Sequence, residues 1–119
     1  MANQELEQLE DRINGMILQG QILEAFDEFY ADHCVMQEPH GTHEGKATNR
    51  KREEEWLASV KEFHGGEVKA VAIGDGVTLS EWWMDVTFQD GNRVNLEQVA
   101  VRRWEHGKIV HERFYYNAG

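Results

Sequence analysis

The chain has 119 residues, enough for one folded domain with its own core and too few for two. It carries 22 acidic against 12 basic residues, and the resulting net charge of -10 repels phosphate backbones, so we expect no nucleic-acid partner. No segment approaches the roughly 20 apolar residues that span a bilayer, and the first residues lack the pattern of a signal peptide. We therefore expect a cytoplasmic protein with no membrane partner.

Two amphipathic helices are predicted at the start of the chain. Apolar residues recur at helical spacing from Leu6 to Ile17, and Gly20 interrupts the pattern. A second, shorter apolar stripe runs from Ile22 to Tyr30. The spacing predicts one helix before Gly20 and another after it, ending near Asp32.

A strand and a polar loop are predicted in the stretch FYADHCVMQEPHGTHEGK, residues 29–46. HCVMQEP has the composition of a short strand that Pro39 ends, and HGTHEG is typical of a loop. The side chains in this stretch with metal-binding chemistry match no zinc-binding spacing, so we expect no metal site: His33, Cys34, His40, His43 and Glu44. Cys34 is the single cysteine, which excludes an intrachain disulfide.

The next segment, residues 46–63, predicts a third helix that Gly65-Gly66 ends. Its charged run NRKREEEW places cations and glutamates at helical spacing, which favours a solvated helix face. The rest of the chain consists of strand-like segments separated by hairpin signals at Asp75-Gly76, Asp90-Gly91-Asn92 and His106-Gly107. They predict a four-stranded antiparallel meander over residues 67–116.

This order of elements predicts an α+β domain in which three N-terminal helices pack against a curved antiparallel sheet. Side chains alternate between the two faces of a strand, and both faces of residues 79–88 carry large groups. One face holds Trp82, Met84, Val86 and Phe88. The other holds Glu81, Trp83, Asp85 and Thr87, and hydrophobicity alone would turn the first set toward the helices.

Three stretches, in this order, resemble the nuclear transport factor 2-like superfamily and its SnoaL-like polyketide cyclases and ketosteroid isomerases: FYADHCVMQEP, HEGKAT and VRRWEHGKIVHERFYY. The resemblance covers nearly the whole chain and is that of a single SnoaL-like domain over residues 1–119. It implies a cone-shaped, cystatin-like fold in which the helices and the concave sheet face enclose a pocket for a small-molecule ligand. The same fold serves isomerases, cyclases, hydrolases and binding modules, so it does not define a reaction.

The resemblance also implies which residues face the pocket, and it reverses the choice made from hydrophobicity. It turns inward Glu81, Trp83, Asp85, Thr87, Gln98, Ala100, Arg102, Glu112, Phe114 and Tyr116. It turns outward Trp82, Met84, Val86, Phe88, Val99 and Val101. An exposed apolar patch of that size favours a homodimer through the convex face.

Glu38 matches the position of the general base of ketosteroid isomerases, a carboxylate directly before a proline at the end of the first strand. With Met36 behind it, a carboxylate there would be suited to proton transfer. Other groups of the family are absent, because Ile13, Ala100 and Phe114 stand where its tyrosine and aspartates are expected. No oxyanion hole of the isomerase kind is therefore expected.

The candidate catalytic residues are Glu38, Asp85 and Arg102, since an arginine flanked by carboxylates resembles the arrangement in epoxide hydrolases of this fold. Substrate contacts are expected from Met36, His40, Trp83, Gln98, Glu112, Phe114 and Tyr116. The structural alternative is an ion-pair network around Arg102 that only maintains strand register. Two functions stay open: proton transfer, cyclisation or hydrolysis of a compact molecule without any cofactor, or ligand binding without chemistry.

Overall fold

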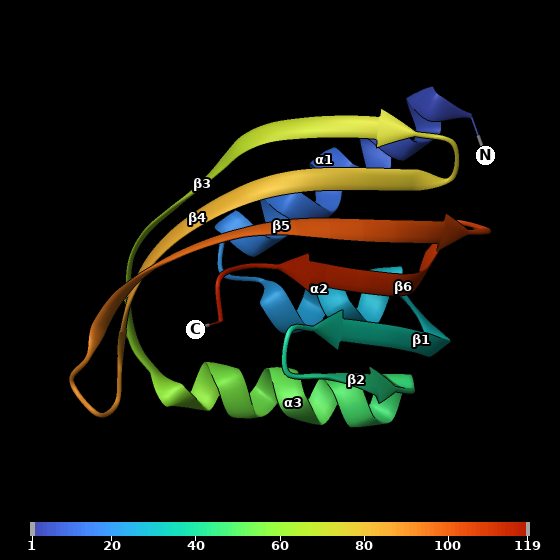
Figure 1. Cartoon of the computed structure of the whole chain (residues 1–119). Coiled ribbons are helices and arrows are strands. Elements are labelled where there is room, and N and C mark those ends of the chain that lie inside the picture. Colours follow the sequence, from blue (N-terminus) through green and yellow to red (C-terminus); the bar gives the residue numbers. More distant parts are fainter. Residues whose placement is uncertain (1, 119) are drawn as a thin grey trace.

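Three helices lie against a strongly bent six-stranded sheet (Figure 1). The structure is a computed structural model that describes residues 2–118. Its elements are α1 (Asn3–Leu18), α2 (Ile22–Phe29), β1 (Tyr30–Glu38), β2 (Gly41–Glu44), α3 (Lys46–Ser59), β3 (Val60–Gly74), β4 (Val77–Phe88), β5 (Arg93–Glu105) and β6 (Lys108–Tyr115). The predicted α+β class and cone are confirmed. No helix in the described range is long and apolar enough to cross a membrane.

The strand order is β2-β1-β6-β5-β4-β3, and β3 to β6 form the predicted antiparallel meander. β1 joins this meander in parallel beside β6, with Met36 opposite Glu112. The long strands curl at one end toward the C-terminal end of α3 (Figure 1). The backbone N–H of Gln89 donates to the carbonyl of Ser59 at 2.8 Å, which holds the β4–β5 turn against the end of α3.

Two predicted boundaries are wrong. α3 ends at Ser59, and Gly65-Gly66 lie inside strand β3, because β3 pairs with β4 along its length through several irregularities. Gly65 pairs with Asp85 and Gly66 with Met84, and a Cβ on Gly65 would make only an ordinary van der Waals contact, at 3.5 Å, with the Trp83 ring. The predicted loop HGTHEG also contains a strand, Gly41–Glu44, which forms a hairpin with β1.

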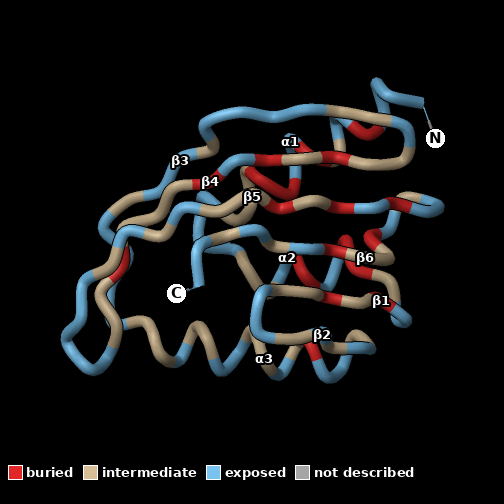
Figure 2. The backbone as a smooth tube through the Cα atoms, viewed as in Figure 1, coloured by how far each residue is buried: buried red, intermediate tan, exposed pale blue. Residues whose placement is uncertain are grey.

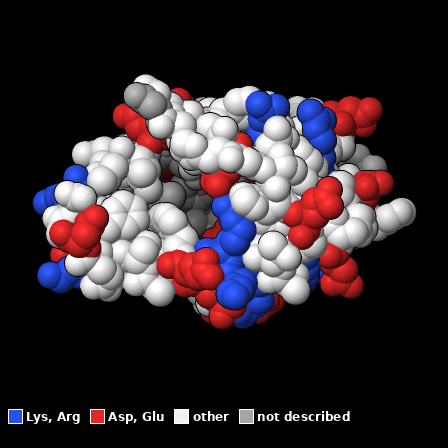
Figure 3. Space-filling view, turned by 60° about the horizontal axis from the view of Figure 1, so that its bottom comes forward, with Lys and Arg blue, Asp and Glu red and all other residues white. Residues whose placement is uncertain are grey.

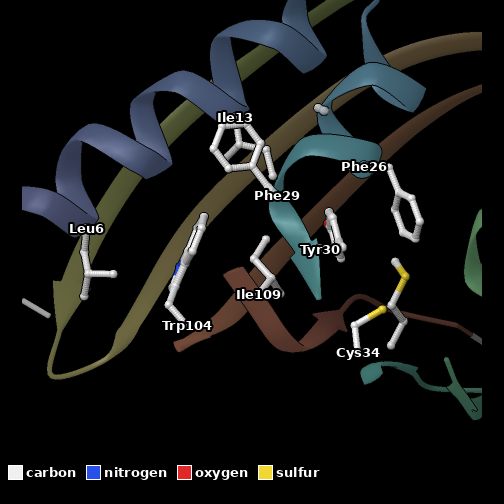
Figure 4. Close-up of a cluster of buried hydrophobic side chains, with 10 residues drawn as sticks. Leu6, Ile13, Phe26, Phe29, Tyr30, Cys34, Trp104 and Ile109 are labelled. Atoms are coloured by element: carbon white, nitrogen blue, oxygen red, sulfur yellow. The ribbon is translucent and has the colours of Figure 1, made fainter. Parts of the chain in front are cut away.

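The hydrophobic core lies where α1 and α2 cover the sheet, and the buried segments in Figure 2 gather there. Phe29 meets Trp104 edge to face at 6.1 Å between ring centroids, and Phe26 stacks on Tyr30 at 4.4 Å. Each fully buried side chain of this size contributes about 1.5–3 kcal/mol. Figure 4 shows these rings together with the aliphatic side chains of Leu6, Ile13 and Ile109.

The inward and outward faces of β4 are the reverse of those that the resemblance implied. Directly opposed residues of an antiparallel pair share a face, and Trp82 opposes Gln98 while Met84 opposes Leu96. Trp82, only 3% exposed, and Met84 both lie on the concave side. The implied alignment was off by one residue on β4, and such a slip moves every side chain to the opposite face.

The β4 part of the apolar patch expected to form a homodimer is therefore used inside the chain, while Val99 and Val101 of β5 lie on the other face. Val86 is fully buried, and Phe88 packs edge to face on Trp56 at 6.4 Å between centroids. Trp83 and Asp85 lie on the convex face, where they contact Asn95 and Arg93. The prediction that Trp83 and Asp85 face the pocket is wrong, while the homodimer and the cytoplasmic location stay predictions.

Candidate functional site

A cavity of about 460 Å³ lies between the helices and the concave face of the sheet. The space-filling view shows a hollow in one face of the molecule with both acidic and basic side chains beside it (Figure 3). Volumes of a few hundred Å³ are typical of small-molecule sites. Most of the wall is apolar or aromatic, including Ile13, Ile17, Phe26, Tyr30, Met36, Trp56, Trp82, Met84, Leu96 and Phe114.

Six charged residues belong to this wall: Glu38, Arg52, Glu53, Glu97, Arg102 and Glu112. Glu97 is exposed, and the other five are at least partly buried. Four of these five form two ion pairs, Glu38 with Arg52 and Glu112 with Arg102, and the fifth is Glu53. Gln98 and Tyr116 also line the cavity, as predicted.

The first group is centred on Glu38 at the end of β1. Arg52 Nη2 of α3 donates to Glu38 Oε1 at 2.7 Å, and the Tyr116 hydroxyl donates to Oε2 at 3.3 Å. His43 Nε2 lies 3.7 Å from Oε1. Burial and the nearby Glu38 charge raise the pKa of Tyr116, which keeps its hydroxyl protonated as the donor. Glu38 thus lies beside Tyr116, whereas Trp83 lies on the opposite face of the sheet.

The second group surrounds Arg102 on β5. Its Nε donates to Glu112 Oε2 at 2.7 Å and its Nη1 to Asn14 Oδ1 at 2.8 Å, and Nη1 also lies 3.0 Å from Glu10 Oε2. Arg102 and Glu112 are buried. Burial by itself would lower the pKa of Arg102, but the charges of Glu112 and Glu10 outweigh burial and raise it. Arg102 is therefore flanked by carboxylates as predicted, with Glu10 where Asp85 was expected.

Hydroxyl and amide groups complete this buried network. Glu10 accepts hydrogen bonds from Thr78 at 2.7 Å and from Ser80. The network ties α1 to the four strands β1, β4, β5 and β6, which supports the structural alternative for Arg102. Its remaining bonds run from Asn14 Nδ2 to Ser80 Oγ at 2.9 Å, from the Tyr30 hydroxyl to Glu112 Oε1 at 2.5 Å, and from Trp104 Nε1 to Thr78 Oγ1 at 2.9 Å.

Sequence reasoning missed Glu10 and Asn14, although a signal was present. Glu10 follows Leu6 by four residues and precedes Ile13 by three, so it falls on the buried stripe of α1. Asn14 lies four residues after Glu10, on the same side of the helix. A polar pair within an apolar stripe indicates a buried partner, and that partner is Arg102.

Glu53 on α3 was also missed, because the run NRKREEEW was interpreted as a solvated helix face. Glu53 lines the cavity, four residues after the buried Asn49 and three before the cavity residue Trp56. Burial, followed by the charge of Glu112, raises the pKa of Glu53 to about 7; Glu38 acts in the same direction, against the two arginines. Glu53 keeps part of its surface accessible and contributes to the cavity wall.

Other predicted site residues lie outside the cavity. His40 is exposed in the turn between β1 and β2 and is absent from the cavity wall, so its predicted substrate contact is wrong. Burial raises the pKa of Cys34, which disfavours the reactive thiolate. Over residues 2–118, no group of three or more His, Cys, Asp or Glu side chains is arranged to hold a metal ion.

A model of the SnoaL-like domain matches residues 1–116, whereas no curated protein shows significant similarity. A proposed SnoaL-like polyketide cyclase from Mesorhizobium loti has a similar structure, with a TM-score of 0.84 and 27% identity over 93% of this chain and 98% of its own. A proposed isomerase from Bacillus subtilis has a TM-score of 0.80 and 16% identity, covering 98% of this chain and 90% of its own. TerC, crystallised with polyporic acid, has a TM-score of 0.77 and 11% identity, and the match covers 92% of this chain and 89% of TerC.

Proposed function

The chain belongs to the SnoaL-like domain family, and from this premise we propose that it binds a compact, largely apolar molecule in its cavity and catalyses cofactor-independent proton transfer on it. The observation that carries the proposal is the position of Glu38. Its carboxylate borders an aromatic cavity and is oriented by Arg52 at 2.7 Å. A carboxylate with a defined orientation beside a bound carbon acid can act as a general base.

In this proposal Glu38 accepts a proton from a carbon atom of the substrate. Arg52 and Tyr116 hold both carboxylate oxygens, so the base is oriented before the substrate arrives. A bound apolar molecule displaces water from the cavity and strengthens the electrostatic interactions within it. Met36 and Trp82 supply apolar contacts to the substrate, and Gln98 supplies a polar one.

Arg102 has a positioning role in the proposal. Its Nε and Nη1 are already bonded to Glu112 and Asn14, so it stabilises the inner wall of the cavity rather than carrying out chemistry. Phe114 and Tyr116 extend that wall toward Glu38. The crystal of TerC with polyporic acid supports small-molecule binding as the use of this cavity.

The proposal is tested with 5-nitrobenzisoxazole, which reports proton abstraction without any cofactor. A base removes the ring C–H proton, the electron pair forms the nitrile, and the N–O bond breaks to release a coloured phenolate. We expect the wild type to accelerate this reaction and Glu38→Gln to lower kcat/KM by about 10²-fold or more. Glu55→Gln, which changes an exposed glutamate of the same helix as Arg52, is the matched control. An unchanged rate in Glu38→Gln would exclude Glu38 as the base.

A binding module without chemistry is the second candidate function. It is favoured by the ion pairs themselves, because Arg52 and Arg102 are both engaged by carboxylates of the same chain. Binding of 4-nitrophenol, followed through the fluorescence of Trp56 and Trp82 in the cavity wall, tests it. Saturable binding together with no acceleration of the benzisoxazole reaction would select the binding module over the enzyme.

A further inference from the structure

Glu53 differs from the other buried or partly buried charged residues of the cavity wall. Glu38 is paired with Arg52, and Arg102 with Glu112. Within residues 2–118, the Glu53 carboxylate forms neither a hydrogen bond nor an ion pair. An unpaired carboxyl group facing a cavity is available to a ligand.

The surroundings of Glu53 favour its protonated form. Burial disfavours a negative charge there most strongly, and Glu112 and Glu38 repel it as well. Arg52 and Arg102 oppose this effect, but each is already paired with another carboxylate. With a pKa of about 7, Glu53 retains its proton in a large fraction of molecules near neutral pH. A protonated carboxyl group is a hydrogen-bond donor as well as an acceptor.

The cavity needs such a donor if it carries out the proposed reaction. Removing a proton next to a carbonyl places negative charge on the carbonyl oxygen, and that charge must be stabilised. Ile13 and Ala100, both buried, stand at the positions where a tyrosine and an acid were expected, and neither side chain can donate. Glu53 approaches the cavity from α3, a different element from either position.

We propose that Glu53 is a second catalytic residue, the general acid that protonates the substrate oxygen while Glu38 removes a proton from carbon. This inference rests on the proposed function. The C–H bond breaks and its electron pair forms a C=C bond, while the carbonyl π electrons take the Glu53 proton to form an enol. Glu38 becomes protonated and Glu53 ionised, and the reverse steps at another carbon restore both. Two carboxyl groups in different environments are the usual basis for dividing acid and base roles.

The proposal also defines a substrate class. The ligand is a mostly apolar carbonyl compound with a C–H bond adjacent to the carbonyl, small enough for a cavity of about 460 Å³. Its carbonyl oxygen lies toward Glu53 and the adjacent carbon toward Glu38. Because burial, Glu112 and Glu38 all disfavour a negative charge at this position, a neutral carbonyl compound is favoured over a carboxylate.

The pH dependence of the 5-nitrobenzisoxazole reaction tests the acid role, because Glu53 would donate to the phenolate oxygen as the N–O bond breaks. We expect the wild-type kcat/KM to fall as the pH rises through about 7, where Glu53 loses its proton. Near pH 6, Glu53→Leu should lose about 10²-fold, because it removes the donor. Glu53→Gln keeps an N–H donor that does not titrate, so it should retain part of the rate and lose the fall near pH 7. Glu55→Gln should keep the wild-type profile.

The outcomes separate this inference from the proposed function. If both Glu53 variants keep the wild-type rate and profile while Glu38→Gln is impaired, Glu53 is not the acid and the proposed function stands. If Glu38→Gln is unimpaired, the proposed function fails first. If the wild-type kcat/KM instead rises through pH 7, and Glu53→Gln abolishes the activity, Glu53 would be the base and the assigned roles would be overturned.

A direct titration of the glutamate carboxyl groups tests the raised pKa of Glu53 independently of any reaction rate. Carbon-13 NMR of protein labelled at glutamate carboxyl groups should show one resonance that titrates near pH 7. That resonance should be missing from Glu53→Gln and present in Glu55→Gln. Its persistence in Glu53→Gln would overturn the assignment without any rate measurement.

Discussion

Arg102 and Glu112 oppose each other across the β5–β6 pair, with Arg102 Nε 2.7 Å from Glu112 Oε2 and both side chains buried. The same guanidinium reaches Glu10 and Asn14 of α1. One cation therefore links the first helix to the centre of the sheet and forms the inner wall of the cavity. Its geometry is the basis of the first prediction.

Arg102→Lys should destabilise the fold by about 3 kcal/mol, because a single ammonium cannot reproduce the fixed geometry of the guanidinium and leaves buried carboxylates poorly paired. Urea denaturation followed by circular dichroism measures the change. Arg103→Lys, at the exposed neighbouring position, should shift stability by less than about 0.5 kcal/mol. Equal effects of the two substitutions would contradict the structural role assigned to Arg102.

The raised pKa of Glu53 predicts a loss of stability as the pH increases. The folded protein binds a proton at Glu53 that the unfolded chain, with an ordinary value of 4.5, has released, so stability should fall between about pH 4.5 and 7. Glu53→Gln removes this dependence. Near pH 8 the variant should be the more stable by up to about 3 kcal/mol, with little difference near pH 5.

Urea denaturation of the wild type, Glu53→Gln and Glu55→Gln at both pH values checks this prediction. Glu55→Gln, at an exposed position of α3, should follow the wild type. A wild-type stability difference between pH 5 and pH 8 that Glu53→Gln leaves unchanged would argue against a buried, proton-binding Glu53.

The two neighbouring tryptophans of β4 should respond differently to truncation. Trp82 is 3% exposed and packs on the concave side, so Trp82→Ala should cost about 3–5 kcal/mol. Trp83 is partly exposed on the convex face, where its Nε1 donates to Asn95 at 2.9 Å, so Trp83→Ala should cost about 1 kcal/mol. Thermal unfolding of both variants measures the difference, and a larger loss for Trp83 would restore the opposite assignment of faces.

Asp85 should have little influence on the reaction. It forms a surface ion pair with Arg93 at 2.8 Å on the convex face, away from the cavity. Asp85→Asn should change stability by less than about 1 kcal/mol, as is typical of exposed pairs. In the 5-nitrobenzisoxazole assay Asp85→Asn should keep the wild-type kcat/KM. A loss as large as that expected for Glu38→Gln would show that Asp85 takes part in the reaction.

Local patterns in the sequence were sufficient for the type and order of most elements. The apolar stripes of α1 and α2 and the turns at residues 75–76, 90–92 and 106–107 are signals carried by a few neighbouring residues. The predicted end of α3 and the predicted loop at β2 were wrong because local patterns do not show which strands pair. Gly65-Gly66 can end a helix or lie within a strand, and the choice depends on pairing with Asp85 and Met84 of another strand. Glu38 was expected at the pocket because its place before Pro39 at the end of a recognisable strand resembles a known base position; it lines the cavity, and its catalytic role stays a prediction.

By itself, the sequence determined that Trp82 and Trp83 lie on opposite faces of one strand, because side chains of a strand alternate with a period of two. Only the tertiary structure decided which of them faces inward, since that depends on the register of β4 against β5, where Trp82 opposes Gln98. The same limit applied to Glu53, one of three consecutive glutamates whose local sequence looks uniformly solvated. The packing of α3 beside β1 turns this glutamate toward Glu112 and the cavity, and its raised pKa arises from burial and from charges distant in the chain.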